Sequence, residues 1–272
     1  MTLFWVVLAG LALAAWFAAE PWLREFRRRR LRSRPLSESY RTLLRRLPFY
    51  RRLPPRLQAE LRGHLQVFLA EKRFVGCAGL AVTDLMRVTI AAQACLLMLG
   101  RGADYFPFLR EILVYPGAFV VKRLQADSNG VHTHLNRTLA GESSSSGQVV
   151  LSWDDALEGS LSADDGRNVV IHEFAHQLDQ EFGHANGAPL LATRSDYARW
   201  SQVLAESFDG LRRHLAAGLP TLLDPYGAQD PAEFFAVACE VFFERGAEMQ
   251  RVEPALYGEL RRYFGVDPAA WA

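Results

Sequence analysis

The residues that most constrain this chain are His172, Glu173 and His176, which form an H-E-x-x-H pentapeptide. The sequence around them predicts a helix over about residues 167–181. Residues four apart share one face of a helix, so both imidazoles can occupy corners of one tetrahedral metal site. Glu173 lies one step around the helix, where a carboxylate can accept a proton from a metal-bound water. The pentapeptide therefore predicts zinc-dependent hydrolysis.

The limits of this helix are also indicated by the sequence. Residues 162–165 (Ser-Ala-Asp-Asp) match a helix-start box, and the apolar residues 169–171 are typical of a buried active-site helix. Gly183 is expected to end the helix. A different interpretation, a core helix with incidental histidines, requires no metal.

Two histidines leave a zinc ion under-coordinated, so a third protein ligand is needed. Asp230 and Pro231 predict the start of an apolar helix that carries two glutamates, Glu233 and Glu240. These glutamates are seven residues apart in the sequence and lie on nearly the same helix face. Glu233 has an alternative role in a capping box, whereas Glu240 lies in an apolar stretch where an unpaired carboxylate is costly. The residues alone leave both glutamates open as the ligand.

Three segments carry a family resemblance: FVGCAGLAVTDLMRVTIAAQACLLMLG, VVIHEFAHQLD and DPAEFFAVACEVFFE. In this order they resemble the Mlc titration factor A family of zinc peptidases, over about residues 57–264. The resemblance implies that His172, His176 and Glu233 bind the metal. It also implies a link to sequestering a glucose-responsive transcriptional repressor.

The chain also resembles the catalytic domain of anthrax lethal factor, which implies an active-site tyrosine upstream of the ligand glutamate. Tyr226, within Asp-Pro-Tyr-Gly, occupies that position. Its alternative role is that of a turn tyrosine after proline.

Asp179 is either an acceptor for the free N–H of a ligand histidine or a solvated helix residue. His132 and His134 share one face of a predicted strand, as metal ligands or as polar residues of a sheet edge.

Residues rich in β-branched side chains precede the active-site helix. Residues 112–121 and 148–153 predict strands, and residues 131–135 alternate as a third. Residues 143–146 are serines and predict a flexible loop. A nearly buried helix is expected over residues 84–99. An edge strand commonly pairs with the substrate backbone in zinc peptidases; we assign this role to residues 148–153, with an ordinary sheet strand as the alternative.

The net charge of +1 hides an asymmetry. Residues 20–73 contain sixteen Lys and Arg against five Asp and Glu, which leaves fifteen against 25 elsewhere, or +11 facing −10. The basic segment indicates an anionic surface nearby, and the acidic remainder argues against direct nucleic-acid binding. The chain has an odd number of cysteines, and all three lie in apolar runs: Cys77, Cys95 and Cys239. This pattern indicates reduced thiols in a cytosolic domain.

Residues 2–19 carry no charge and are just long enough to span a bilayer as a helix. No Lys or Arg precedes this run, whereas seven arginines follow it from Arg24 to Arg34, which favours retention of the C-terminal side in the cytoplasm. A cleaved secretory signal and an interfacial helix are the alternatives. The expected organisation is a transmembrane anchor (1–22), a basic juxtamembrane connector (23–55) and a zincin-like peptidase domain (56–272).

Together these features predict an α+β zincin-like metallopeptidase domain, mostly helical with a small sheet, preceded by one transmembrane helix. Zinc held by His172, His176 and Glu233, with Glu173 as general base and Tyr226 at the oxyanion, would hydrolyse a peptide or protein substrate. The expected location is the bacterial inner membrane, single-pass, with the catalytic domain on the cytoplasmic side. The alternative function is a regulatory protein that sequesters a transcriptional repressor of sugar uptake, with weak peptidase activity. A membrane-tethered scaffold with a structural metal is a third.

Overall fold

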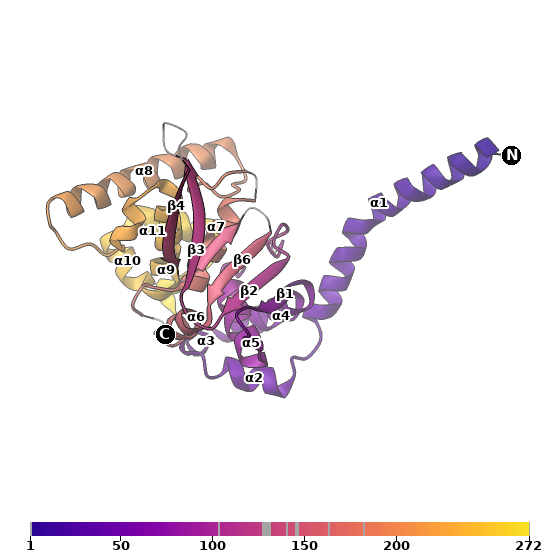
Figure 1. Cartoon of the computed structure of the whole chain (residues 1–272), viewed down its shortest axis with the longest axis horizontal. Helices are drawn as coiled ribbons and strands as arrows, with labels where there is room; N and C mark the ends of the chain where they lie inside the picture. The colour runs from indigo at the N-terminus through magenta and orange to yellow at the C-terminus, as the bar shows by residue number, and fades with distance from the viewer. Residues whose placement is uncertain are drawn as a thin grey trace.

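A four-stranded sheet and the helices packed beside it organise the body, and the first helix projects away from it (Figure 1). The structure, a computed structural model, describes residues 2–102, 104–126, 132–139, 141–144, 147–162, 164–181 and 183–271. Its helices are α1 (Thr2–Arg32), α2 (Glu38–Leu44), α3 (Pro48–Arg52), α4 (Pro55–Glu71), α5 (Asp84–Leu96), α6 (Trp153–Leu161), α7 (Val169–Asp179), α8 (Arg194–Ala216), α9 (Pro231–Glu244), α10 (Gly246–Val252) and α11 (Pro254–Phe264), with 3-10 turns η1 (Pro225–Ala228) and η2 (Pro268–Ala270). Its strands are β1 (Arg73–Gly76), β2 (Glu111–Tyr115), β3 (Phe119–Ala126), β4 (His132–Leu139), β5 (Gly141–Ser144) and β6 (Gln148–Ser152). The prediction of a mostly helical α+β domain with a small sheet is confirmed.

The larger sheet has the strand order β1-β2-β6-β5. The first three strands run parallel, and β5 pairs antiparallel with β6. The central strands bury Ile112, Val114, Val149 and Leu151 completely, as expected of parallel strands covered by helices. β3 and β4 form a separate antiparallel ribbon.

The structure corrects the predicted strand over residues 112–121. This run is two strands, because the chain bends at Pro116 and Gly117 between β2 and β3. Proline has no backbone N–H to donate to a sheet, so it favours an interruption at this point. The predicted strand over residues 131–135 falls within β4, except for residue 131, which lies outside the described residues.

The predicted serine loop and edge strand also need correction. Ser143 and Ser144 belong to β5, where they pair with β6, and the serines that follow at 145 and 146 lie outside the described residues. Residues 148–153, the proposed edge strand, correspond to β6 and to the first residue of α6. β6 is paired on both sides, so β5 lies at this edge of the described sheet. The sequence did not predict that β5 is the edge strand, because β5 is short and polar.

α7 is surrounded by other elements of the body. It contacts α9, α5, α6 and the strands β5 and β6. Phe174 on this helix is fully buried, and its ring centroid lies 4.9 Å from that of Phe106 and 5.7 Å from that of Phe68. α5, beside it, is capped by the Thr83 hydroxyl and ends three residues before the predicted limit. Aromatic packing therefore fixes the helix that carries the H-E-x-x-H motif.

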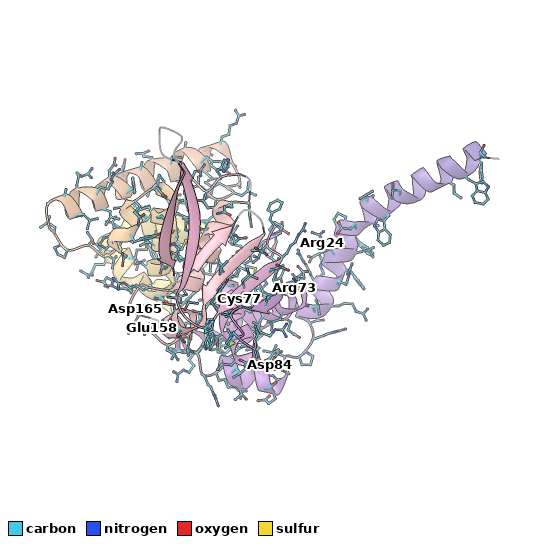
Figure 2. The ribbon with its side chains drawn as sticks, in the orientation of Figure 1. Arg24, Arg73, Cys77, Asp84, Glu158 and Asp165 are labelled. Atoms are coloured by element: carbon cyan, nitrogen blue, oxygen red, sulfur yellow. The ribbon has the colours of Figure 1, made fainter. Side chains whose placement is uncertain are left out.

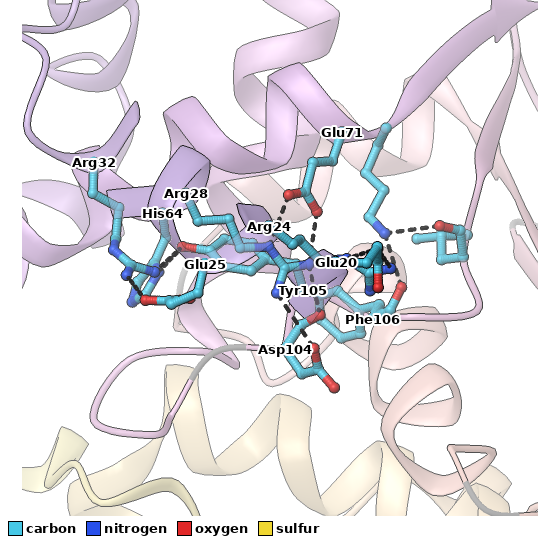
Figure 3. A network of polar contacts seen from close by, with 12 residues as sticks. Glu20, Arg24, Glu25, Arg28, Arg32, His64, Glu71, Asp104, Tyr105 and Phe106 are labelled. Carbon is cyan, nitrogen blue, oxygen red and sulfur yellow. Dashed lines mark hydrogen bonds and ion pairs between the residues drawn. The ribbon is translucent and has the colours of Figure 1, made fainter. Parts of the chain in front are cut away.

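The basic half of α1 is bound to the body by a polar network (Figure 3). Arg28, only 7% exposed, donates two 2.8 Å hydrogen bonds to the carboxylate of Glu71 on α4. Arg32 donates to the Tyr105 hydroxyl, which also lies 2.9 Å from His64 Nδ1. A bidentate pair of this kind specifies how α1 sits on α4, because the buried Arg28 charge would be costly without its partner.

Residues after α1 contribute side chains to the same core as α7 and α9. The segment continues from α1 into α2 and α3, the short helical pieces expected of a proline-rich stretch. The following are buried: Leu36, Leu44, Leu47, Phe49, Tyr50 and Leu53.

The predicted transmembrane helix is not confirmed. Residues 2–19 are helical as the first part of α1, which continues into the arginine-rich stretch. Within the part of the chain that the structure describes, no helix combines the length and the apolar character needed to cross a membrane.

Glu244, at the end of α9, is a buried carboxyl group that is 8% exposed. Its Oε1 accepts a hydrogen bond from Asn168 Nδ2 at 2.9 Å, and its Oε2 accepts one from the Gly166 amide at 3.1 Å. Burial raises the pKa of Glu244 to about 8, although the hydrogen bond from Asn168 lowers it in part. Proton uptake at this position therefore makes folding depend on pH.

We expect Glu244→Gln to remove a pH-dependent loss of stability. A carboxyl group with a raised folded pKa contributes its full stability below its ordinary pKa and loses it as the pH rises through about 8. Between about pH 5.5 and 8.5 the wild type should lose on the order of a few kcal/mol of unfolding free energy relative to the variant, measured with urea. Glu248→Gln, at a carboxylate 38% exposed on α10, is the control. Parallel pH profiles for wild type and Glu244→Gln would contradict the expectation.

Candidate metal and catalytic site

α7 presents the H-E-x-x-H residues on its buried side. The helix begins after Asn168, whose side-chain oxygen accepts a hydrogen bond from the Ile171 amide at 3.0 Å, and it ends at Asp179. The predicted helix over residues 167–181 is thus confirmed with shorter limits. The predicted start box at 162–165 does not cap it, because Asn168 performs that role.

Three side chains meet in the arrangement expected of metal ligands. His172 and His176 lie one turn apart, and Glu233 reaches them from α9. The two Nε2 atoms are 3.2 Å apart, and Glu233 Oε2 lies 3.0 Å from His172 Nε2 and 3.3 Å from His176 Nε2. Ligand atoms from all three residues lie within 4.8 Å of one another. Two imidazoles and a carboxylate form a donor set that fits a divalent transition metal such as zinc.

Glu233 lies in the first turn of α9 and directs its carboxylate to the histidines. Asp230 Oδ1 accepts hydrogen bonds from the amides of Ala232 and Glu233, and Pro231 occupies the first turn. The carboxylate of Glu233 itself contacts His172, His176 and Tyr226, so the alternative that it folds back in a capping box is wrong. Burial acts to raise the pKa of Glu233, but its hydrogen bonds with the two histidines outweigh it and hold that pKa well below its usual value.

Glu240 occupies a different position around the same imidazole. Its Oε1 lies 2.8 Å from His172 Nδ1, and its Oε2 accepts a hydrogen bond from the Asn168 amide. The Glu240 carboxylate thus has the partners that a buried charge requires, namely His172 and the Asn168 amide. It is not one of the three residues whose ligand atoms cluster together. A carboxylate on Nδ1 fixes the proton there and leaves Nε2 as the metal-binding atom. The spacing of seven residues between Glu233 and Glu240 is the sequence feature that could have predicted this supporting role, because it places both on one face of α9.

Glu173 is enclosed beside the ligands. It is 5% exposed, and its Oε2 has no hydrogen-bond partner among the described residues. Burial raises the pKa of Glu173 to about 7, although the nearby histidines oppose this shift. A carboxyl group with a pKa near neutrality is suited to accepting and returning a proton.

Tyr226 joins the site from η1. Asp224 orients this turn by accepting a hydrogen bond from the Tyr226 amide at 2.9 Å. The Tyr226 hydroxyl donates to Glu233 Oε1 at 3.3 Å, and its ring centroid lies 5.8 Å from that of His172. The structure therefore brings Tyr226 next to the ligand set, where its hydroxyl can donate to a bound substrate.

Asp179, His132 and His134 are the remaining residues that the sequence offered for the site. Asp179 is buried and accepts hydrogen bonds from the amides of Gly187 and Ala188, so it is not a solvated helix residue. It anchors the loop that follows α7. His132 and His134 belong to β4, and their side chains lie outside the described part of the structure.

Comparison with known proteins agrees with this geometry. Residues 23–265 match the family described as glucose-regulated metallo-peptidase M90. The chain belongs to this family. It is 41% identical over 260 residues to an uncharacterized protein of Synechocystis sp., which covers 95% of this chain and 94% of the relative. It is 36% identical to Mlc titration factor A of Pectobacterium atrosepticum, over 75% of this chain and 77% of the relative, and 35% identical to that of Yersinia pestis, over 74% and 75%.

Membership confirms the resemblance predicted from the sequence, and it supports a metallopeptidase-type activity that uses a metal ion. The match begins at residue 23, so it includes the basic half of α1 and the buried segment that follows. It ends at residue 265, immediately after α11.

We expect Glu233→Gln to weaken metal binding more than Glu240→Gln does. The first change removes a ligand oxygen, whereas the second perturbs the proton on His172 Nδ1, an effect worth about 10- to 100-fold in affinity. Both changes keep the Asp230 cap. Titration of the apo protein with zinc against a competing chelator measures the two affinities. A larger loss of zinc affinity in Glu240→Gln than in Glu233→Gln would show that Glu240, and not Glu233, is the metal ligand.

Proposed function

We propose that this protein is a zinc-dependent peptidase. The observation that carries the proposal is the juxtaposition of Glu173 with the ligand set of His172, His176 and Glu233. A closed structural zinc site has four protein ligands and no use for a general base, whereas a catalytic site has three ligands and an open position. The three ligands here and the neighbouring buried carboxyl group fit the catalytic type.

The residues divide the work of peptide hydrolysis as follows. His172, His176 and Glu233 would hold the ion, which when bound supplies Lewis acidity and lowers the pKa of a water. Glu173 takes the proton of the attacking water and returns it to the leaving amine. The Tyr226 hydroxyl donates a hydrogen bond to the oxyanion.

The sheet edge suggests how a substrate is held. β5 lies at the end of the described sheet, next to α7. An extended peptide can add to such an edge through main-chain hydrogen bonds, which require no particular side chains. We therefore transfer to β5 the substrate-binding role predicted for residues 148–153.

We further propose that α1 attaches the protein to the bacterial inner membrane, with the catalytic domain in the cytoplasm. The first part of α1 projects beyond the body (Figure 1), and Arg24 lies where the helix approaches the body (Figure 2). Support comes from large apolar side chains that are 46–67% exposed along its first half: Phe4, Trp5, Leu8, Leu13, Trp16 and Phe17. Exposed apolar groups of this size are costly in water and are stabilised by lipid. The arginines that follow favour a cytoplasmic body.

A second function, the binding of a transcriptional repressor, is supported by the name that two relatives carry, Mlc titration factor A. Repressor binding requires a docking surface and no general base. Peptide hydrolysis therefore requires the Glu173 carboxylate, whereas repressor binding does not.

We expect Glu173→Gln to retain normal zinc content and to lower peptidase activity by several orders of magnitude, because Glu173 acts on water without binding the metal. Metal analysis and turnover of a mixed peptide library measure the two effects. Glu158→Gln, at an exposed glutamate on α6 (Figure 2), is the control and should retain both. Undiminished turnover in Glu173→Gln would sink the general-base role. Zinc binding without cleavage by the wild type would favour the repressor-binding function.

We expect the full-length protein to remain with membranes through a high-salt wash, because attachment rests on apolar burial and salt screens only charges. Deletion of residues 2–19 should release a folded domain with unchanged peptidase activity. Fractionation measures attachment, and a reporter fused after Ala272 measures orientation. Recovery of the wild type in the soluble fraction would refute attachment. Activity of a periplasm-only reporter would refute the cytoplasmic orientation.

A further inference from the structure

Gly141, the first residue of β5, lies directly against Glu173. A Cβ atom built on Gly141 would fall 2.5 Å from Glu173 Oε1, 2.6 Å from its Cγ and 2.8 Å from its Cδ. Carbon atoms do not approach one another so closely, so any side chain at position 141 would displace Glu173 or β5. The backbone conformation of Gly141 does not itself require glycine, because its φ is not in the left-handed region. The need for glycine here comes from the contact alone.

Packing therefore contributes to the orientation of Glu173. The carboxyl group is enclosed, and its Oε2 has no hydrogen-bond partner among the described residues. An oxygen without such a bond is held in place by the atoms packed around its side chain. The three nearest neighbours of the missing Cβ are all atoms of Glu173, so the backbone at Gly141 is one wall of its cavity.

The strand behind this wall is firmly placed. Gly141 pairs with Leu151 of β6, and Leu151 is fully buried. β6 in turn pairs along its whole length with β2. A contact made by a sheet strand is more reproducible than one made by a loop, because several main-chain hydrogen bonds fix its position.

We infer that Gly141 is a positioning residue for Glu173: the absence of a side chain lets the edge strand lie on the general base and fix the direction of its carboxyl group. The inference rests on the proposed peptidase function for its kinetic consequence, and on the contact alone for its structural consequence. A misplaced general base slows proton transfer, whereas the three metal ligands are untouched.

The kinetic test is Gly141→Ala in the full-length, zinc-loaded protein. We expect unchanged zinc content, a kcat lowered at least about tenfold and a smaller change in KM, because the substrate still meets the same strand edge. Gly246→Ala is the matched control, since a Cβ there would be crowded at 2.9 Å by Ala269 and Pro268, away from the site. It should cost stability and leave kcat unchanged. An unchanged kcat in Gly141→Ala would overturn the inference.

The structural test is a double-mutant cycle that does not depend on activity. We expect Gly141→Ala to lower the Tm by at least about 2 °C in the wild type and by less than half as much in a Glu173→Ala background, where the crowding atoms are absent. Gly246→Ala should cost the same Tm in both backgrounds. Equal losses for Gly141→Ala in both backgrounds would overturn the inference.

Two further outcomes are covered by the same cycle. If Gly141→Ala does not fold, folding of the double variant with Glu173→Ala supports the contact, and failure of both overturns it. If the wild type cleaves no peptide, the peptidase proposal fails, while the Tm cycle still decides the contact between Gly141 and Glu173.

Discussion

The site depends on one imidazole that α9 holds at both ring nitrogens. Glu240 occupies Nδ1 of His172, and Glu233 lies 3.0 Å from Nε2. The two glutamates are two helical turns apart, so both reach the same ring only when α7 and α9 have one relative rotation and one relative height. The same pair of contacts therefore sets the packing of two helices and the direction of a metal-binding lone pair. An apolar contact of equal area would set the packing without fixing the proton.

Asn168 extends this constraint to the start of α7. Its side chain caps the helix, its amide donates to Glu240, and its Nδ2 lies within hydrogen-bonding distance of Gln93, Gly159 and Glu244. Buried polar groups linked in this way stabilise the structure only when every partner is present. The helix consequently begins at one defined residue. The polar groups of this network are tolerated in an otherwise apolar core because they are partners of one another.

The sequence predicted the parts of the site that depend on local spacing. H-E-x-x-H places His172 and His176 on one helix face by geometry alone, and Asp230 with Pro231 marks the start of α9. The parts that it missed depend on contacts between distant segments. Nothing local distinguishes Asn168 from the acidic residues just before it as the cap, because the choice is made by Glu240, 72 residues away. Gly141 similarly has no local signature, because its importance arises from the helix that packs beneath it.

The basic half of α1 has a structural role that its charge pattern alone does not reveal. Tyr105 and Phe106 adopt left-handed backbone conformations, with φ of 55° and 50°, and this turn is held by Arg28 and Arg32 on α1. Phe106 then packs on Phe174, the residue that follows Glu173. Arginines that the sequence indicates as membrane-facing charges therefore also support α7, the helix that carries the H-E-x-x-H motif. A test of membrane orientation by charge removal must spare Arg28 and use the exposed arginines, since loss of the pair that the buried Arg28 makes with Glu71 would disturb folding and topology together.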